Sequence, residues 1–182
     1  TNTSVRSLCF TGGRLYAGGG GGVFVSTDFG ASWAPASFGL TDSIVQSLTA
    51  VGSAIYAGTK GGVFRSSDNG SSWHPASFGL TNLNVRAIAT VGGALLAGTA
   101  GGVFRSTDDG GTWSSASAGM TNTDITGLGA TSSAVVAGTA TGAFRSTDGG
   151  LNWIPVPSGR SFLTFAGTGS ALFAGTSSGV YA

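Results

Sequence analysis

Residues 26–33 read STDFGASW, and residues 66–73, 106–113 and 146–153 repeat its pattern of serine, aspartate, glycine and tryptophan. The tryptophans that close the four copies lie 40 residues apart each time. The shared positions are Ser26, Asp28, Gly30, Trp33, Ser66, Asp68, Gly70, Trp73, Ser106, Asp108, Gly110, Trp113, Ser146, Asp148, Gly150 and Trp153. A repeat of about 40 residues is the size of one four-stranded β-propeller blade. The sequence therefore predicts an array of propeller blades.

Each repeat consists of short segments rich in Val, Ile, Phe and Ala, separated by Gly, Ser, Asp or Asn. This punctuation is typical of strands and turns and leaves no room for a helix. In the second repeat we expect strands at residues 45–51, 54–57, 62–66 and 73–77, followed by a linker at 78–81. The fold class is therefore predicted to be all-β, with four strands in each complete blade.

The fifth repeat is shorter than the others. Ala17, Ala57, Ala97 and Ala137 are 40 residues apart, but the matching Ala174 follows after 37. We expect a single propeller domain over 1–182, with blades at about 1–40, 41–80, 81–120, 121–160 and 161–182, the last of three strands. No donor for a fourth strand is visible in the sequence. The expected object is a five-bladed ring with an incomplete last blade, or a partial ring that another chain completes.

The repeated pattern resembles the Asp-box (BNR) repeat, whose signature is Ser-x-Asp-x-Gly-x-x-Trp, and residues 97–108 are similar to repeats of bacterial extracellular propellers. The resemblance implies a β-propeller with each box on the hairpin between the third and fourth strands of a blade. It also implies a secreted or cell-surface location. It does not imply one function, because the box is found in sialidases, other glycoside hydrolases, sorting receptors and assembly factors.

The residue types of the box suit a structural turn. A short aspartate accepts turn N–H groups, the following glycine adopts a backbone conformation that is costly for other residues, and serine adds a local hydroxyl bond. A tryptophan side chain buries about 200 Å2 and stabilises what it packs on. We therefore expect all the shared positions to be structural and all four tryptophans to be buried.

Composition excludes several functions. The chain of 182 residues carries 8 Lys and Arg against 7 Asp and Glu, with a net charge of +1 and no basic cluster, so nucleic acid is not an expected partner. The lone Cys9 provides neither an internal disulfide nor a thiol pair for a metal. Charge-free stretches such as 125–144 are broken by Gly and Ser, so no membrane insertion is expected. No cofactor is predicted.

Catalytic residues are scarce. The sequence has no glutamate, and outside the four box aspartates the only carboxylates are Asp42, Asp109 and Asp124. Glycoside hydrolysis normally needs two carboxylates at a set separation, and the sialidase branch would need a glutamate behind its tyrosine nucleophile. Tyr16 and Tyr56 align with apolar residues of other repeats and are predicted to be core. We therefore expect no enzyme, and His74 is expected to lie on the surface.

Three functions stay open. The favoured one is a structural or self-assembling module that pairs with itself or with a strand of another protein. Its predicted edge is Gly179, Val180, Tyr181 and Ala182, because from Ser161 onward no charge or proline protects the last strand. The second is a glycan-binding propeller, supported by Phe29, Phe38 and Phe78 as exposed aromatics. A partial hydrolase comes third.

One further residue recurs. Arg65, Arg105 and Arg145 each stand just before a box. We expect these arginines to span neighbouring blades or to lie on an aromatic ring.

Overall fold

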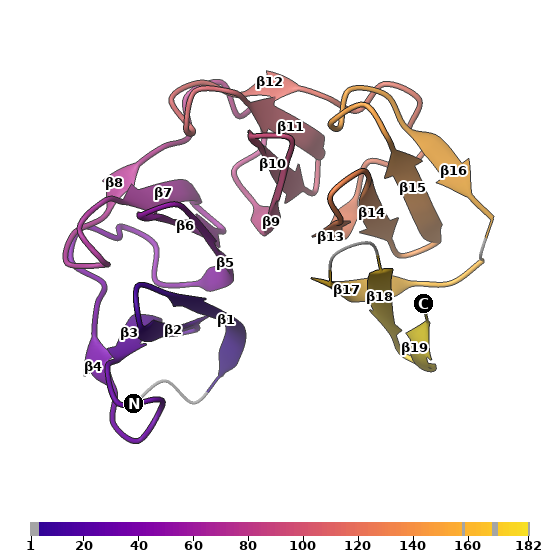
Figure 1. The fold of residues 1–182 in the computed structure, drawn as a ribbon. Helices are drawn as coiled ribbons and strands as arrows, with labels where there is room; N and C mark the ends of the chain where they lie inside the picture. The colour runs from indigo at the N-terminus through magenta and orange to yellow at the C-terminus, as the bar shows by residue number, and fades with distance from the viewer. Residues whose placement is uncertain (1–3, 158, 169–170, 182) are drawn as a thin grey trace. The chain divides into compact units, whose positions relative to one another are not determined.

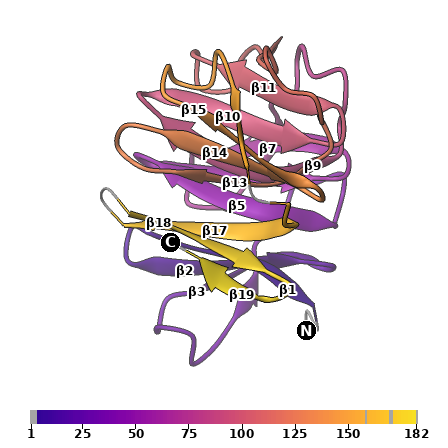
Figure 2. The same ribbon diagram turned by 90° about the vertical axis from the view of Figure 1, so that its right-hand side faces the viewer.

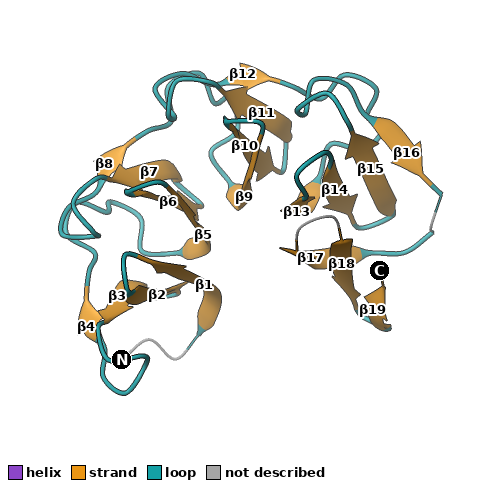
Figure 3. Cartoon of the chain, viewed as in Figure 1, coloured by secondary structure: helices purple, strands orange, loops and turns teal. Residues whose placement is uncertain are grey.

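The computed structural model describes residues 4–157, 159–168 and 171–181, and in these ranges it contains strands, turns and loops but no helix (Figures 1 and 3). The strands form five sheets in chain order, four of four strands and a last one of three. The predictions of an all-β fold and of about five propeller blades with a three-stranded last blade are confirmed. Figure 2 shows β17, β18 and β19 side by side in the last sheet.

The first two blades consist of β1 (Val5–Thr11), β2 (Arg14–Gly19), β3 (Gly22–Ser26) and β4 (Ala34–Pro35), then β5 (Val45–Val51), β6 (Ala54–Thr59), β7 (Gly62–Ser66) and β8 (His74–Pro75). Blade three has β9 (Val85–Val91), β10 (Ala94–Thr99), β11 (Gly102–Ser106) and β12 (Ser114–Ser115). Blade four has β13 (Ile125–Ala130), β14 (Val135–Thr139), β15 (Gly142–Ser146) and β16 (Ile154–Val156). Blade five has β17 (Phe162–Thr168), β18 (Ala171–Thr176) and β19 (Gly179–Tyr181).

The contacts divide the chain into two compact units. One unit is the chain up to Ser77 together with Leu83–Ile88, and the other is Phe78–Asn82 together with the chain from Ala89. Blades one and two thus belong to the first unit, and blades four and five to the second. A single domain over 1–182 stays a prediction.

A β-bulge shapes the first strand of a blade. In β5 the pairing with β6 shifts register between Val45 and Ser47, and β1, β13 and β17 shift at the equivalent place. In a regular strand, the side chains of residues three apart point to opposite faces of the sheet. The extra residue of a bulge between them brings both side chains to the same face. Val45 and Leu48 can therefore face the preceding blade together.

This apolar pair packs on a glycine in the second strand of the preceding blade, an arrangement we call the blade joint. The joints are Val45 and Leu48 on Gly18, Val85 and Ile88 on Gly58, Ile125 and Leu128 on Gly98, and Phe162 and Phe165 on Gly138. A Cβ atom added at these glycines would lie 2.5 to 2.8 Å from the first residue of the pair, closer than real Cβ contacts allow. Glycine is therefore required for one blade to approach the next.

The fourth strand is shorter than expected. The sequence predicts a strand over 73–77, but β8 contains only His74 and Pro75. The backbone N–H of Trp73 donates to the carbonyl of Phe38 in the linker before blade two, at 2.9 Å, and not to β7. At the other end the backbone N–H of Ala76 donates to the Val63 carbonyl at 2.8 Å. The Ser77 hydroxyl accepts the N–H of Val63 at 2.8 Å and also donates to the Val63 carbonyl.

The indole N–H groups of two tryptophans bond to the preceding blade. The indole N–H of Trp73 donates to the carbonyl of Ala36, and that of Trp153 donates to the carbonyl of Ala116, both at 2.8 Å. Trp73, Trp113 and Trp153 are 1%, 4% and 2% exposed, whereas Trp33 is 39% exposed. The expectation of four buried tryptophans is wrong for Trp33. Its indole donates to Gly30 of its own box, because no preceding blade among the described residues offers a carbonyl.

Replacing Trp73 with alanine should lower the free energy of unfolding by about 3 to 5 kcal/mol, the usual cost of deleting a buried aromatic side chain. Trp33→Ala, at the same position of its own box, should cost clearly less, because that side chain is 39% exposed and its removal leaves a smaller buried cavity. Urea unfolding followed by circular dichroism measures both. Equal losses for the two variants would contradict burial by the preceding blade.

Candidate functional site

The Asp box is a closed set of hydrogen bonds. In the second copy the Ser66 hydroxyl donates to Oδ1 of Asp68 at 2.8 Å and accepts the N–H of Gly70 at 2.8 Å. Oδ1 of Asp68 also accepts the backbone N–H of Ser72, and Oδ2 accepts its hydroxyl. The same bonds recur at Ser26 with Asp28, Ser106 with Asp108 and Ser146 with Asp148, Asn152 supplying the last donor in the fourth copy.

The residue after each box aspartate has a left-handed backbone. Phe29, Asn69 and Asp109 have φ of 56°, 58° and 57°. Residues other than glycine rarely adopt this backbone conformation. The turn directs a carbonyl to the preceding blade, where the Tyr16 hydroxyl donates to Asn69 at 3.0 Å. In the second unit Nε of Arg105 donates to the carbonyl of Gly149 at 3.0 Å.

Two of the three recurrent arginines, Arg65 and Arg105, make the predicted kinds of contact, and for Arg145 the role stays a prediction. Arg105 spans to the next blade through the Gly149 carbonyl. Arg65 lies over the ring of Tyr56, 6.0 Å from its centroid, and its Nε donates to the Tyr56 hydroxyl at 3.2 Å. Tyr16 and Tyr56 are buried, which confirms that they belong to the core.

The box aspartates are held in their ionised form. The hydroxyl of Ser32, then its backbone N–H and the Ser26 hydroxyl, lower the pKa of Asp28 to about 2. The equivalent donors lower the pKa of Asp68 and Asp108 to about 2, and the backbone and side-chain N–H groups of Asn152 lower that of Asp148. A carboxylate stabilised in this way is a poor general acid.

The remaining carboxylates and the histidine are found in linkers, in a turn and in an outer strand. Oδ1 of Asp42 accepts the N–H of Ile44 in the linker before β5, Asp109 belongs to a box turn, and His74 is exposed in β8. Within the described ranges no group of three or more His, Cys, Asp or Glu is placed to hold a metal ion. The same part of the chain contains no helix with the length and hydrophobicity of a membrane span.

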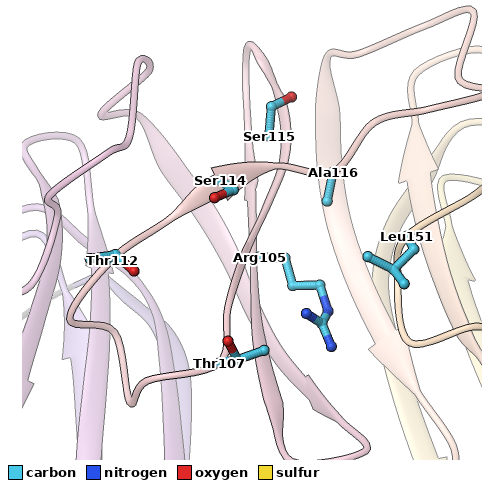
Figure 4. A pocket seen from close by; sticks show the side chains of 7 residues that line it. All are labelled: Arg105, Thr107, Thr112, Ser114, Ser115, Ala116 and Leu151. Carbon is cyan, nitrogen blue, oxygen red and sulfur yellow. The ribbon is translucent and has the colours of Figure 1, made fainter.

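Two small grooves occupy equivalent places, between the outer strand of one blade and the box of the next. The groove of the second unit has a volume of about 130 Å3, and Figure 4 shows the Arg105 side chain in it, between Thr107 and Leu151. Its lining is Arg105, Thr107, Thr112, Ser114, Ser115, Ala116 and Leu151. The groove of the first unit, about 160 Å3, includes Arg14, Val25 and Phe38. Both are smaller than the usual ligand pocket of about 300 Å3 or more.

The three phenylalanines predicted to be exposed are exposed in the structure. Phe29, Phe38 and Phe78 are the most exposed large apolar side chains among the described residues. Phe29 stacks on Phe10 with centroids 6.4 Å apart.

The predicted assembly edge is the free side of β19. Gly179, Val180 and Tyr181 are all exposed, and β19 pairs only with β18 in its sheet, while Ala182 lies outside the described residues. The expectation that no charge protects this edge is wrong. The guanidinium of Arg160 lies 4.2 Å from the centroid of the Tyr181 ring, and its Nη1 donates to the Tyr181 hydroxyl. Arg160 precedes the charge-free stretch, so its separation in sequence concealed the contact.

No family model and no curated protein matches the chain. Solved structures resemble it in fold. An ancestral GH74 enzyme is 22% identical with a TM-score of 0.73 over 95% of this chain. The extracellular domain of BT4673 from B. thetaiotaomicron is 16% identical with a TM-score of 0.80 over 98%. A chain of a nidogen/laminin complex is 14% identical with a TM-score of 0.76 over 94%.

These likenesses concern the fold alone. The chain spans 27% of the GH74 enzyme chain and 27% of the BT4673 chain, and 72% of the chain in the nidogen/laminin complex. The neighbours include an enzyme and an extracellular domain. The chain is therefore a five-bladed array of the β-propeller fold, a fold that serves several functions.

Asp108→Asn should lower the melting temperature at pH 7, because the amide lacks an oxygen for one of the donors that hold the carboxylate. The folded pKa of Asp108 is about 2, below its ordinary value of 3.8. The stabilisation is therefore complete above about pH 4 and is lost as the pH falls through 2. The difference in melting temperature between wild type and variant should narrow between pH 4 and pH 2.

Thermal unfolding followed by circular dichroism at pH 7, 5, 4, 3 and 2 measures this difference. Thr112→Val is the matched control. It removes the hydroxyl that donates to Oδ2 of Asp108 but keeps the backbone N–H that donates to Oδ1 at 2.8 Å, so it should cost less. A difference between Asp108→Asn and wild type that stays constant from pH 7 to pH 2 would refute the charge-based account.

Proposed function

We propose that this chain is a non-catalytic β-propeller of the Asp-box (BNR) type that acts as a structural, self-assembling interaction module of a secreted or cell-surface protein. The observation that carries the proposal is the last sheet, which ends in the exposed strand β19 (Gly179–Tyr181). The partner is a second copy or a strand of another protein.

The Asp-box assignment is supported by the serine hydroxyl bonds, which recur in all four copies. In each, one serine hydroxyl connects the aspartate to the glycine N–H two residues beyond it. A residue that contacts a ligand has no reason to recur with the same internal bonds in every blade. The sixteen shared positions are therefore assigned to structure, with Trp33 differing in its burial.

A non-catalytic role is supported by how the carboxylates are used. The four box aspartates each accept several hydrogen bonds and have lowered pKa values. Asp42 accepts a backbone N–H in a linker, and the sequence contains no glutamate. A glycosidase needs one carboxyl that donates a proton and a second across the sugar bond, which this distribution does not provide.

Assembly through β19 is supported by its exposed edge and by the low charge of the chain as a whole. An exposed strand edge presents N–H and C=O groups that a further strand can pair with. Val180 is 72% exposed, so its side chain leaves the edge accessible. With 8% charged residues in the chain, little repulsion opposes the approach of a second copy. A similar fold in a nidogen/laminin complex shows such folds in protein assemblies, although likeness in fold is only an analogy.

Wild-type protein should self-associate in sedimentation velocity experiments over a concentration series. Introducing lysine at both Val180 and Tyr181 should weaken association at least tenfold, because the charges must be desolvated when a strand pairs with the edge. Phe78→Lys, at an equally accessible site in a linker, is the control and should leave association unchanged. Circular dichroism checks that all variants keep the β-sheet signal.

A protein that sediments as a monomer at its highest soluble concentration would overturn the assembly proposal. Glycan binding would then be the better function. The specific observation in its favour is the Arg105 groove, whose lining combines one guanidinium with four hydroxyl side chains, a surface suited to acidic sugars. The exposed Phe38 borders the equivalent groove of the first unit.

A further inference from the structure

The sequence contains one Asn-Gly dipeptide, Asn69–Gly70, and it lies inside the second Asp box. Asparagine before glycine is prone to deamidation, because glycine has no Cβ to obstruct the approach of its backbone nitrogen to the asparagine side chain. In this reaction the nitrogen of Gly70 forms a bond to Cγ of Asn69 and the bond from Cγ to Nδ2 breaks. Ammonia leaves with the proton that Gly70 loses, and water opens the cyclic succinimide to aspartate or isoaspartate.

The two reacting residues lie in different surroundings. Asn69 is exposed, whereas Gly70 is buried. The N–H of Gly70 donates to the Ser66 hydroxyl at 2.8 Å, and a Cβ placed on Gly70 would lie 3.1 Å from the Tyr16 ring. The Gly70 nitrogen must lose its proton and turn toward Cγ of Asn69 before it can attack. The hydrogen bond to Ser66 and the burial of Gly70 oppose both steps.

The backbone of Asn69 is held as well. Its φ is 58°, and the Tyr16 hydroxyl donates to its carbonyl at 3.0 Å. Ring closure turns the peptide group between Asn69 and Gly70, which moves both the carbonyl that Tyr16 binds and the N–H that Ser66 binds. Deamidation therefore requires a local opening of the second box.

Aspartate, the first of the two products, fits the closed box. Asp109 stands at the equivalent position of the third box and has φ of 57°. The N–H of the following Gly110 donates to the Ser106 hydroxyl at 2.9 Å, as in the second box. The third box therefore has the structure that an aspartate at position 69 would give.

Isoaspartate, the second product, does not fit. Its main chain runs through Cβ and Cγ and is longer by a carbon atom. The Ser66 hydroxyl bonds to both Asp68 and the N–H of Gly70, and the added atom lies between these two partners. Trp73 closes the same box and bonds to the preceding blade. A box that cannot close again therefore weakens the contact between blades one and two.

We propose that Asn69 is a covalent modification site whose deamidation is controlled by the second Asp box. While the box is closed, the bond from Gly70 to Ser66 protects Asn69. When the box opens, Asn69 deamidates, and the isoaspartyl product prevents the box from closing again. The reaction is irreversible, so modified chains accumulate with each opening of blade two. The proposal does not depend on the proposed self-assembly.

Peptide mapping by mass spectrometry of the full chain, incubated at pH 8, measures the deamidation rate of Asn69. The rate in the folded wild type should be at least about tenfold lower than in wild type unfolded in urea. Ser66→Ala removes the acceptor of the Gly70 N–H and should raise the rate in the folded chain by about tenfold, the factor that the loss of one hydrogen bond gives. Ser106→Ala removes the equivalent acceptor in blade three. It is the matched control and should leave the rate at Asn69 unchanged.

Equal rates in the folded and the unfolded wild type would overturn the proposal. Equal acceleration by Ser66→Ala and Ser106→Ala would also overturn it, because the effect would then follow from a general loss of stability. Circular dichroism checks that both variants keep the β-sheet signal. If Ser66→Ala does not fold, Tyr16→Phe tests the same opening, since it keeps the ring but removes the hydroxyl that binds the Asn69 carbonyl. An unchanged rate in that variant would overturn the proposal.

The two products are compared by thermal unfolding. Asn69→Asp should melt at the wild-type temperature, because Asp109 occupies the equivalent position of the third box. The isoaspartyl chain, obtained by ageing wild type in urea and separated by chromatography before refolding, should melt at a lower temperature. Equal melting temperatures of these two proteins would show that isoaspartate does not keep the box open. Sedimentation of wild type tests the proposed function separately.

Discussion

The contact on which the rest of the structure depends is the packing of an apolar pair of one blade on a glycine of the blade before it. Val45 and Leu48 approach Gly18 so closely that no side chain fits there. The two residues face the same side of the sheet because of a bulge. The second strands β6 and β10 are buried along their whole length. A blade is therefore stabilised mainly by its neighbours, as in other repeat proteins.

The Asp box also connects a blade to the blade before it. Its internal bonds fix a turn whose left-handed residue presents a carbonyl to the preceding blade, where Tyr16 or Arg105 binds it. Trp73 then donates to Ala36 and Phe38 of the linker. Local hydrogen bonding and packing between blades thus depend on each other.

The periodicity of the boxes was sufficient to predict the strands, the blade count and the structural role of Arg65 and Arg105, because these follow from local pattern and repetition. It could not predict the exposure of Trp33, since burial there depends on a neighbour and not on the repeat itself. The contact of Arg160 with Tyr181 joins residues 21 apart in sequence and follows no periodicity. The fourth strand begins after Trp73 because the Trp73 N–H bonds to the Phe38 carbonyl in the linker, a partner that the hydrophobic pattern does not reveal.

A double-mutant cycle on Gly18 and Val45 measures the central contact directly. Gly18→Ala should cost about 1 to 3 kcal/mol by overpacking and Val45→Ala about 2 kcal/mol by leaving a cavity. Because the removed methyl groups make room for the new one, the double variant should cost at least about 1 kcal/mol less than the sum. Effects that add within about 0.5 kcal/mol would contradict the account.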